Sequence, residues 1–448
     1  MTQSQNTAII LAAGLGTRMR SRLPKVLHRL AGVPMLTHLI GSLEGAYQRI
    51  IVVTGPDMDA VAACAAPHRT VIQHDRRGTA DAARAAQDWF GDGLVSIVYG
   101  DNPLLSPGIF QLLLAAVEGA GKADLALIGT RPPEPGSFGR IIAQRDAVQG
   151  DAVERIVEFA DATVAERAVD LCNIGGFTAR AADVRRWLGA IDDDNAKGEF
   201  YLTDLVARAR AEARLVRVIE APWEDCLGVN SRAELAVAEA SVQARLRASA
   251  LALGVTMTAP ETVFLAADTA LDSDVTIEPN VIFGPGVRVA RDVTIRGFSH
   301  LEGCTIEAGA VIGPFARVRP GSVIEQDAHV GNFCEVKATR LGAGAKVNHL
   351  SYLGDAEIGA RTNIGAGTIT CNYDGKLKHR TVIGADVFVG SDVALVAPVQ
   401  VGDGAMIAAG SIITEDVAAD ALALGRARQV QKPGRAAMLR AYQAKDQT

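Results

Sequence analysis

The chain has 448 residues, of which 48% are hydrophobic and 21% charged, and its formal net charge is −6. This length predicts two or three domains, and the composition is typical of a folded protein with ordinary cores. Charge and hydropathy argue against nucleic-acid binding, because no basic tract is present, and against a membrane span, because no apolar run is long enough.

The cysteines and the start of the chain predict a cytoplasmic protein. Six cysteines are scattered without any Cys-x-x-Cys pair, which indicates reduced thiols rather than a disulfide framework or a zinc site. The first residues lack the basic start and long apolar segment of a secretory signal.

Residues 7–228 alternate between strand-like and helix-like segments. Thr7–Ala13, Ile50–Thr54 and Val95–Tyr99 are short apolar runs of the kind that form buried parallel strands. An alanine-rich stretch, Ala80–Phe90, is typical of a helix between two of them. The alternation predicts a mostly parallel sheet with helices on both faces and ligands at the carboxyl ends of the strands.

A phosphate-binding turn is predicted directly after the first strand. The segment Leu11–Met19 carries two glycines, a threonine and Arg18, and Pro24-Lys25 adds a second cation nearby. Glycines let backbone N–H groups approach a phosphate, and Arg18 supplies a charged fork for it. A Gly-x-Gly alone is a weak signal, since position 19 is Met and no P-loop lysine follows, so a surface turn with solvated charges is the alternative.

A carboxylate follows the third strand at the same edge of the sheet. In Tyr99-Gly100-Asp101, the aspartate could cap a helix, which is the common role of such a residue. Beside a phosphate site we interpret Asp101 as a magnesium ligand, because Mg²⁺ prefers one or two carboxylates together with substrate phosphates.

A connector helix is predicted between two domains. Ser231-Arg232-Ala233-Glu234 is a capping box that opens an alanine-rich helix to about Leu253, and Gly254 closes it. The predicted division is an α/β domain over 1–229, a helical linker over 230–254, and a C-terminal domain with a tail over 255–448.

Aliphatic residues recur at every sixth position in the C-terminal third of the chain. One series is Ile306, Ile312, Val318, Ile324, Val330 and Val336, and a second is Ile383, Val389, Leu395, Val401, Ile407 and Ile413. Neither a helix nor a flat strand has this period. It predicts a parallel β-helix in which each hexad forms one side of a triangular coil, with an ordinary sandwich of short strands as the alternative. The period stops beyond Val417, and a polar, helical tail is expected over Lys432–Thr448.

A histidine and an interrupting loop mark a possible site on this solenoid. A lone histidine is more often structural, but His349 has Arg319 and Lys337 on nearby coils. The hexads then break at Thr370–Lys376, and a loop that interrupts a repeating scaffold often carries function.

These motifs together resemble the bacterial bifunctional N-acetylglucosamine-1-phosphate uridylyltransferase/glucosamine-1-phosphate acetyltransferase family. The resemblance rests on Gly-x-Gly-Thr-Arg-Met with Pro-Lys, on Gly78-Thr79, on Tyr-Gly-Asp, and on the following hexapeptide repeats, and it covers nearly the whole chain. It implies an α/β Rossmann-like domain followed by a left-handed parallel β-helix. It also implies synthesis of UDP-N-acetylglucosamine, the precursor of peptidoglycan and lipopolysaccharide.

The resemblance implies residues for uridylyl transfer. Arg18 and Lys25 would neutralise charge as the sugar phosphate attacks UTP, and Asp101 and Asn230 would bind Mg²⁺. The residues implied to contact UTP or UDP-N-acetylglucosamine are Leu11, Ala12, Ala13, Gly14, Lys25, Gln73, Gly78, Thr79, Tyr99, Gly100, Asp101, Gly139, Glu158, Asn173 and Asn230. Among them Gln73, Gly78 and Thr79 would read the uracil. Phe138 departs from the Tyr that is common in the family before Gly-Arg-Ile.

The resemblance likewise implies residues for acetyl transfer. His349 would be the general base that takes the proton of the glucosamine amine, with Glu335 orienting it. Arg319, Lys337, Tyr352 and Asn363 would hold the amino-sugar phosphate. Ala366, Asn372, Tyr373, Ser391, Ala409 and Arg426 would line the acetyl-CoA site. Gly425 and Ala427, which flank Arg426, differ from commoner family residues.

The family also implies a homotrimer formed through the β-helix. Two alternatives compete with the bifunctional interpretation. One is a single-activity nucleotidyltransferase whose β-helix is regulatory or oligomerising, against which His349 and the Asn372-Tyr373 loop argue. The other is a non-catalytic assembly subunit. The retention of four residues argues against it: Arg18, Lys25, Asp101 and Asn230.

Overall fold

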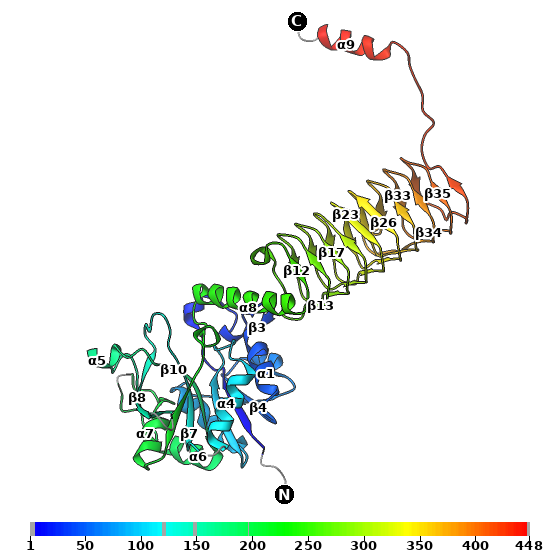
Figure 1. Cartoon of the computed structure of the whole chain (residues 1–448). Coiled ribbons are helices and arrows are strands. Elements are labelled where there is room, and N and C mark those ends of the chain that lie inside the picture. Colours follow the sequence, from blue (N-terminus) through cyan, green and yellow to red (C-terminus); the bar gives the residue numbers. More distant parts are fainter. Residues whose placement is uncertain (1–4, 119–121, 147–149, 196, 446–448) are drawn as a thin grey trace. The chain divides into compact units, whose positions relative to one another are not determined.

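The computed structural model describes residues 5–118, 122–146, 150–195 and 197–445 (Figure 1). They divide into two compact units, Met1–Arg245 and Leu246–Thr448. In this described part, no helix is long and apolar enough to cross a membrane.

The first unit is built on one mixed sheet of nine strands. In spatial order these are β5 (Arg69–Ile72), β4 (Arg49–Thr54), β1 (Thr7–Leu11), β6 (Leu94–Tyr99), β10 (Cys172–Arg180), β7 (Leu125–Thr130), β11 (Val216–Glu220), β9 (Gly150–Val157) and β8 (Gly139–Asp146). The three predicted strands are confirmed as β1, β4 and β6, which run parallel. The expectation of a mostly parallel sheet holds only for part of it, because β10 runs antiparallel to β6 and β7, and β8 and β9 form an antiparallel pair.

Helices cover both faces of this sheet, as the alternation predicted. The core on one face includes residues of α1 (Met35–Glu44), α2 (Asp59–Ala65) and α4 (Pro107–Glu118). The opposite core includes residues of α3 (Thr79–Ala85), α6 (Ala181–Ala190) and α7 (Asp204–Ala211). Ile9 and Ile10 are both fully buried and belong to opposite cores, which explains why β1 is a continuous apolar run.

Two predicted helices are present with altered details. The stretch expected to be helical over Ala80–Phe90 is split into α3 and a short 3₁₀ turn, Gln87–Trp89. The connector is α8 (Arg232–Ala252), and the Ser231 hydroxyl accepts from the backbone N–H of Glu234 at 3.2 Å. The Glu234 carboxylate, however, accepts from the N–H of Asn230 at 2.7 Å and therefore anchors the residue before the expected cap.

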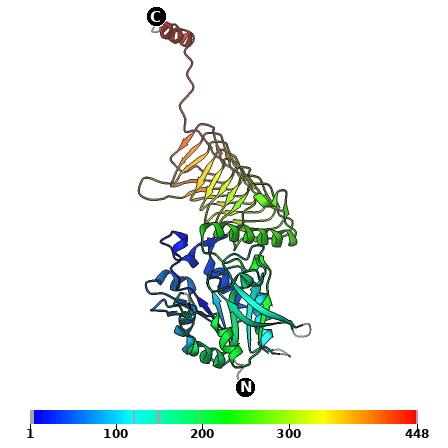
Figure 2. The ribbon, with the colours of Figure 1, turned by 90° about the vertical axis from the view of Figure 1, so that its left-hand side faces the viewer.

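The second unit is a parallel β-helix of three sheets, and its strands stack coil upon coil (Figures 1 and 2). Sheet 1 contains β12 (Thr256–Met257), β14 (Thr276–Ile277), β17 (Thr294–Ile295), β20 (Val311–Ile312), β23 (His329–Asn332), β26 (Lys346–His349), β29 (Asn363–Ile364), β32 (Phe388–Val389), β35 (Met406–Ile407) and β37 (Leu422–Ala423). Sheet 2 contains β15 (Ile282–Phe283), β18 (His300–Leu301), β21 (Arg317–Val318), β24 (Glu335–Lys337), β27 (Tyr352–Gly354), β30 (Ile369–Cys371), β33 (Ala394–Val396) and β36 (Ile412–Ile413). Sheet 3 contains β13 (Ala270–Leu271), β16 (Arg288–Val289), β19 (Thr305–Ile306), β22 (Val323–Ile324), β25 (Arg340–Leu341), β28 (Ala356–Ile358), β31 (Thr381–Ile383) and β34 (Val399–Val401).

The six-residue period is the packing pattern of the solenoid core. Ile306 pairs with Ile324 on sheet 3, and Ile312 pairs with Val330 on sheet 1, so each inward aliphatic side chain stacks on the equivalent one in the next coil. All four are fully buried. The left-handed sense of the coils, which the family resemblance implies, stays a prediction.

The predicted interruption of the repeats is present as a loop that leaves the stack (Figure 2). It lies between β30 and β31, and Tyr373 closes its base through an isolated antiparallel bridge to Lys378. The chain then rejoins the register, since Ile358 of β28 pairs with Ile383 of β31. The tail that was expected to be helical contains α9 (Arg435–Lys445).

Candidate functional site

A cavity of about 580 Å³ lies in the first unit, at the carboxyl ends of β1 and β6. Its lining includes nearly all the residues predicted for the nucleotide and the sugar: Leu11, Ala12, Ala13, Gly14, Arg18, Lys25, Gln73, Gly78, Thr79, Tyr99, Asp101, Gly139, Glu158, Asn173 and Asn230. Gly100 lies behind the wall, where its N–H donates to the carbonyl of Leu11 at 3.0 Å. The predicted contact of Gly100 with the nucleotide stays a prediction.

The glycine turn and its two cations form one side of the cavity. Gly16 has a left-handed φ of 61°, and a Cβ there would lie 2.6 Å from the Cβ of Lys25. The turn therefore needs glycine to pack against the Pro-Lys segment. Arg18 is exposed at the rim, where a guanidinium can reach an incoming phosphate.

Lys25, Asp101 and Asn230 meet at one point of the cavity wall. The Lys25 ammonium lies 2.5 Å from Oδ2 of Asp101 and 2.9 Å from Oδ1 of Asn230. Two oxygen ligands thus converge on a single cation. In the described part of the chain, no three His, Cys, Asp or Glu residues cluster as a ready-made metal site, so any divalent ion here would depend on these two oxygens and on substrate phosphates.

A partly buried carboxylate, Glu158, lines the part of the cavity that is predicted to hold the sugar. Glu158 accepts from the Thr203 hydroxyl at 3.2 Å, and burial raises the pKa of its carboxyl above the ordinary value. Asn173 is buried, and its Oδ1 accepts from the N–H of Gly175 at 3.1 Å. Phe138 lines the same cavity and packs edge-on against Trp223, with ring centroids 5.9 Å apart, so the departure from Tyr leaves an apolar wall there.

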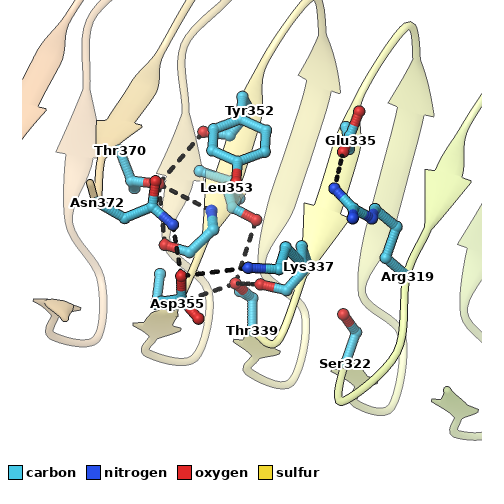
Figure 3. Close-up of polar contacts among 12 residues, drawn as sticks. Arg319, Ser322, Glu335, Lys337, Thr339, Tyr352, Leu353, Asp355, Thr370 and Asn372 are labelled. Atoms are coloured by element: carbon cyan, nitrogen blue, oxygen red, sulfur yellow. Dashed lines mark hydrogen bonds and ion pairs between the residues drawn. The ribbon is translucent and has the colours of Figure 1, made fainter. Parts of the chain in front are cut away.

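On the solenoid, cations and carboxylates from successive coils of sheet 2 lie side by side (Figure 3). The Arg319 guanidinium contacts Oε1 of Glu335 at 2.7 Å, and the Lys337 ammonium lies 3.5 Å from Asp355. Asn372, from the interrupting loop, donates to the same Asp355 oxygen at 2.5 Å, which ties the base of the loop to the coil beside Tyr352.

Lys378 is a cation of this cluster that the sequence analysis missed. It is exposed on the interrupting loop, and a contact with the Lys337 ammonium lowers its pKa. The sequence pattern could not place Lys378 beside Lys337, because the hexad pattern does not extend into the loop. Its position follows from the fold of the loop, in which Lys378 pairs with Tyr373.

His349 stands at the end of β26 and is exposed. Its Nδ1 lies 2.8 Å from Oδ1 of Asn332, the residue paired with it on the preceding coil. The amide oxygen accepts, so Nδ1 carries the proton of this hydrogen bond, and in the neutral imidazole Nε2 has the free lone pair. Asn332 thus contacts the imidazole, whereas Glu335 contacts Arg319, and the expected orienting role of Glu335 stays a prediction.

The corner between sheets 1 and 2 collects most of the other predicted residues. Ala366, Ser391 and Ala409 occupy equivalent turns of successive coils, since the N–H of Asp392 donates to Ala366 O and that of Gly410 to Ser391 O. Arg426 follows in the next turn, where its Cδ would lie 3.8 Å from a Cβ on Gly410. Asn363 is on β29 of sheet 1, and Tyr373 is exposed on the loop.

Nearer the N-terminus, the same corner carries an exposed aromatic ladder, Phe298, Phe315 and Phe333. Their rings stack with centroids 4.9 and 5.1 Å apart, although between 45% and 58% of each residue is exposed. All three have left-handed φ values of 55° to 60°, which is uncommon for a bulky residue. Leu350, directly after His349, continues the row and is 64% exposed.

Fold and cavity define a sugar-nucleotidyltransferase-like enzyme joined to a hexapeptide-repeat transferase. Residues 8–158 match the family of MobA-like NTP transferase domains, and residues 380–415 match the bacterial transferase hexapeptide family (six repeats). The chain is 71% identical over 440 residues to "Bifunctional protein GlmU" of Acidiphilium cryptum, covering 98% of this chain and 99% of that protein. It is 60% identical to the protein of the same description from Gluconacetobacter diazotrophicus, covering 97% and 94%.

The chain belongs to the GlmU family of bifunctional proteins. This confirms the resemblance that the motifs predicted, and with it a bifunctional uridylyltransferase/acetyltransferase of UDP-N-acetylglucosamine synthesis. The single-activity and non-catalytic alternatives are not supported.

The raised pKa of Glu158 leads to a prediction about stability and pH. Because the folded-state pKa lies above the ordinary value of 4.5, ionisation destabilises the folded state at higher pH, and this cost disappears as the pH falls below both values. We expect Glu158→Gln to raise the thermal midpoint at pH 8, with a gain that shrinks toward zero as the pH falls through the folded pKa.

Glu166→Gln is the matched control with the opposite sign. Hydrogen bonds from the backbone and hydroxyl of Thr163 lower the pKa of Glu166, so its carboxylate stabilises the fold above its ordinary pKa. That variant should lose stability at pH 8 and recover it at low pH. The measurement is the thermal midpoint of both variants and the wild type from pH 3 to 8. A Glu158→Gln protein less stable than wild type at pH 8 would contradict the claim that ionised Glu158 destabilises the folded state.

Proposed function

We propose that each unit carries one of the two activities. The N-terminal unit couples N-acetylglucosamine 1-phosphate to UTP with release of pyrophosphate, and the solenoid acetylates glucosamine 1-phosphate with acetyl-CoA. The observation that carries this proposal is the separation of the predicted residues into two clusters, around Lys25 in the first unit and around Lys337 and His349 in the second.

Uridylyl transfer needs positioning and charge neutralisation rather than a covalent enzyme intermediate. An oxygen of the sugar 1-phosphate attacks the α-phosphorus of UTP in line with the leaving pyrophosphate. Arg18 at the rim of the cavity and Lys25 in its wall bind the phosphates. The sugar is held by three other lining residues, Glu158, Asn173 and the backbone of Gly139. Gln73, Gly78 and Thr79 face the uracil.

We assign Asp101 and Asn230 to a magnesium ion. Their oxygens already converge on the Lys25 ammonium, so the pair fits a small cation. When bound, Mg²⁺ supplies positive charge against the charge that develops on the transferring phosphate. With these two oxygens on the ion, the Lys25 ammonium would be free to contact a phosphate oxygen.

Acetyl transfer uses His349 as general base. The glucosamine amine attacks the thioester carbonyl carbon, Nε2 of His349 takes a proton from the amine, and the thiolate of coenzyme A leaves. Asn332 holds the imidazole in the tautomer with Nε2 free. Arg319, Lys337 and Lys378 provide charge for the sugar phosphate, and Tyr352 and Asn363 orient the sugar.

Acetyl-CoA lies along the corner between sheets 1 and 2, over Ala366, Ser391, Ala409 and Arg426 and beside Asn372 and Tyr373 of the loop. Small side chains leave room there for an extended ligand. On the coils that precede His349 in the chain, the same corner carries the aromatic ladder. We propose that a second copy of the chain covers this ladder in a homotrimer. The free cysteines support a cytoplasmic location.

Reciprocal variants test the division of activities. His349→Ala should reduce acetyl transfer by about 10²–10⁴-fold, the usual contribution of a positioned base, and leave UTP-dependent activity unchanged. Asp101→Ala should abolish UTP-dependent activity and leave acetyl transfer intact, also in EDTA. Both half-reactions are assayed on each full-length protein. Acetyl transfer near the wild-type rate in folded His349→Ala, or loss of acetyl transfer in EDTA, would refute these roles.

A charge placed in the aromatic ladder tests the assembly. Phe315→Glu should convert the trimer to smaller species in light scattering and lower acetyl transfer, because it buries a charge between stacked rings. Thr305→Glu is the control, since Thr305 lies on the same turn of the solenoid but on sheet 3. A Phe315→Glu protein that keeps the wild-type mass would show that the ladder is not the interface.

A further inference from the structure

The side-chain amide of Gln73 has one orientation in the cavity wall. Its Nε2 donates to the carbonyl of Gly78 at 3.1 Å and to Oδ2 of Asp81 at 2.9 Å. Both partners can only accept, since an ionised carboxylate and a carbonyl carry no proton. The amide nitrogen must therefore face them, and the carbonyl oxygen Oε1 points the other way, on the side where Gln73 lines the cavity.

The Asp81 side chain is held in place beside the Gln73 amide. Asp81 is 8% exposed on α3, and its second oxygen accepts from Nη2 of Arg77 at 2.9 Å in an ion pair. Main-chain bonds fix the segments on either side. The N–H of Gln73 donates to Thr54 O at 2.8 Å, and the N–H of Phe200 donates to Arg77 O at 2.8 Å. Gly78, with a φ of 128°, packs against the Phe200 backbone, where a Cβ would lie 2.5 Å from its carbonyl oxygen.

The orientation of the Gln73 amide decides which base edge the site can bind. An acceptor presented to the cavity pairs with the N3–H of uracil. Cytosine has an unprotonated N3 at that position, so two acceptors would face each other without a proton between them. A site built to satisfy a hydrogen bond rejects an analogue that cannot make it, because buried polar groups are then left unpaired.

We propose that Asp81 is the positioning residue for nucleobase selection: it fixes the Gln73 amide so that the cavity accepts uracil and excludes cytosine. This inference rests on the proposed role of Gln73 as the residue that reads the base. Asp81 acts through Gln73 and does not touch the nucleotide.

The test is the ratio of kcat/KM for UTP to kcat/KM for CTP in the full-length protein. Asp81→Asn keeps the size of the side chain but can donate as well as accept, so the Gln73 amide gains a second satisfied orientation. We expect the ratio to fall about tenfold or more, with the KM for the sugar phosphate and the rate of acetyl transfer unchanged. Calorimetric affinities for UDP and CDP should shift in the same sense, independently of catalysis.

Two control variants separate this inference from the function it rests on. Arg77→Gln removes the ion pair but keeps the carboxylate, and it should leave the ratio close to wild type. Gln73→Ala should collapse the ratio if Gln73 reads the base, and an unchanged ratio in that variant would refute the reading role itself.

If Gln73→Ala collapses the ratio while Asp81→Asn changes UTP and CTP equally, the role of Asp81 alone is overturned. If Arg77→Gln lowered the ratio of kcat/KM for UTP to that for CTP as much as Asp81→Asn does, the role of Asp81 would also be overturned. Loosened packing around Asp81 would then explain the lower ratio. Asp81→Ser, a smaller side chain that both donates and accepts, gives the same test should Asp81→Asn not fold.

Discussion

The stacking of inward aliphatic side chains in register is the constraint on which the solenoid unit depends. Ile312 pairs with Val330 and Val330 with Val347, and all three are fully buried. A slip of one residue along a coil would expose the aliphatic side chain and bury a polar neighbour, so the register has one solution. That solution also decides which polar residues meet on the outside, because Asn332 lies beside His349 and Glu335 beside Tyr352 only in this register.

At both proposed sites, the cations assigned to phosphate binding are in contact with carboxylates. Lys25 contacts Asp101, Lys337 contacts Asp355, and Arg319 contacts Glu335. Partly buried charges are costly when left unpaired, so these contacts lower the cost of keeping cations in the wall of a site. Under the proposed assignment, a phosphate would replace a carboxylate at each cation, so the net free energy of binding would be smaller than the phosphate contacts alone suggest. In the proposed mechanism, the Lys25–Asp101 pair would link metal and nucleotide binding, since the oxygens that Lys25 contacts are the ones assigned to Mg²⁺.

The sequence predicts these elements to different extents, and the reason is physical. The six-residue period gave the β-helix because every coil repeats the same inward position. The strands ending at Leu11 and Tyr99 were found because a buried parallel strand is a continuous apolar run. Strand β10 could not be placed in antiparallel pairing between β6 and β7, because local pattern does not encode which distant strand is the neighbour. Lys378 and Asn332 were missed for a related reason: one lies on a folded-back loop, and the other is recognised only through its bond to His349.

The most direct test of this account is a double-mutant cycle between Asn332 and His349, measured as kcat/KM for acetyl transfer. If coil register brings the two residues together and Asn332 acts by holding the imidazole, Asn332→Ala should lower the rate in the wild-type background. It should have no further effect in the His349→Ala background, so that the two losses are strongly non-additive. Losses that add, with both proteins folded and UTP-dependent activity intact, would contradict the claim that stacking of the coils assembles the acetyl-transfer site.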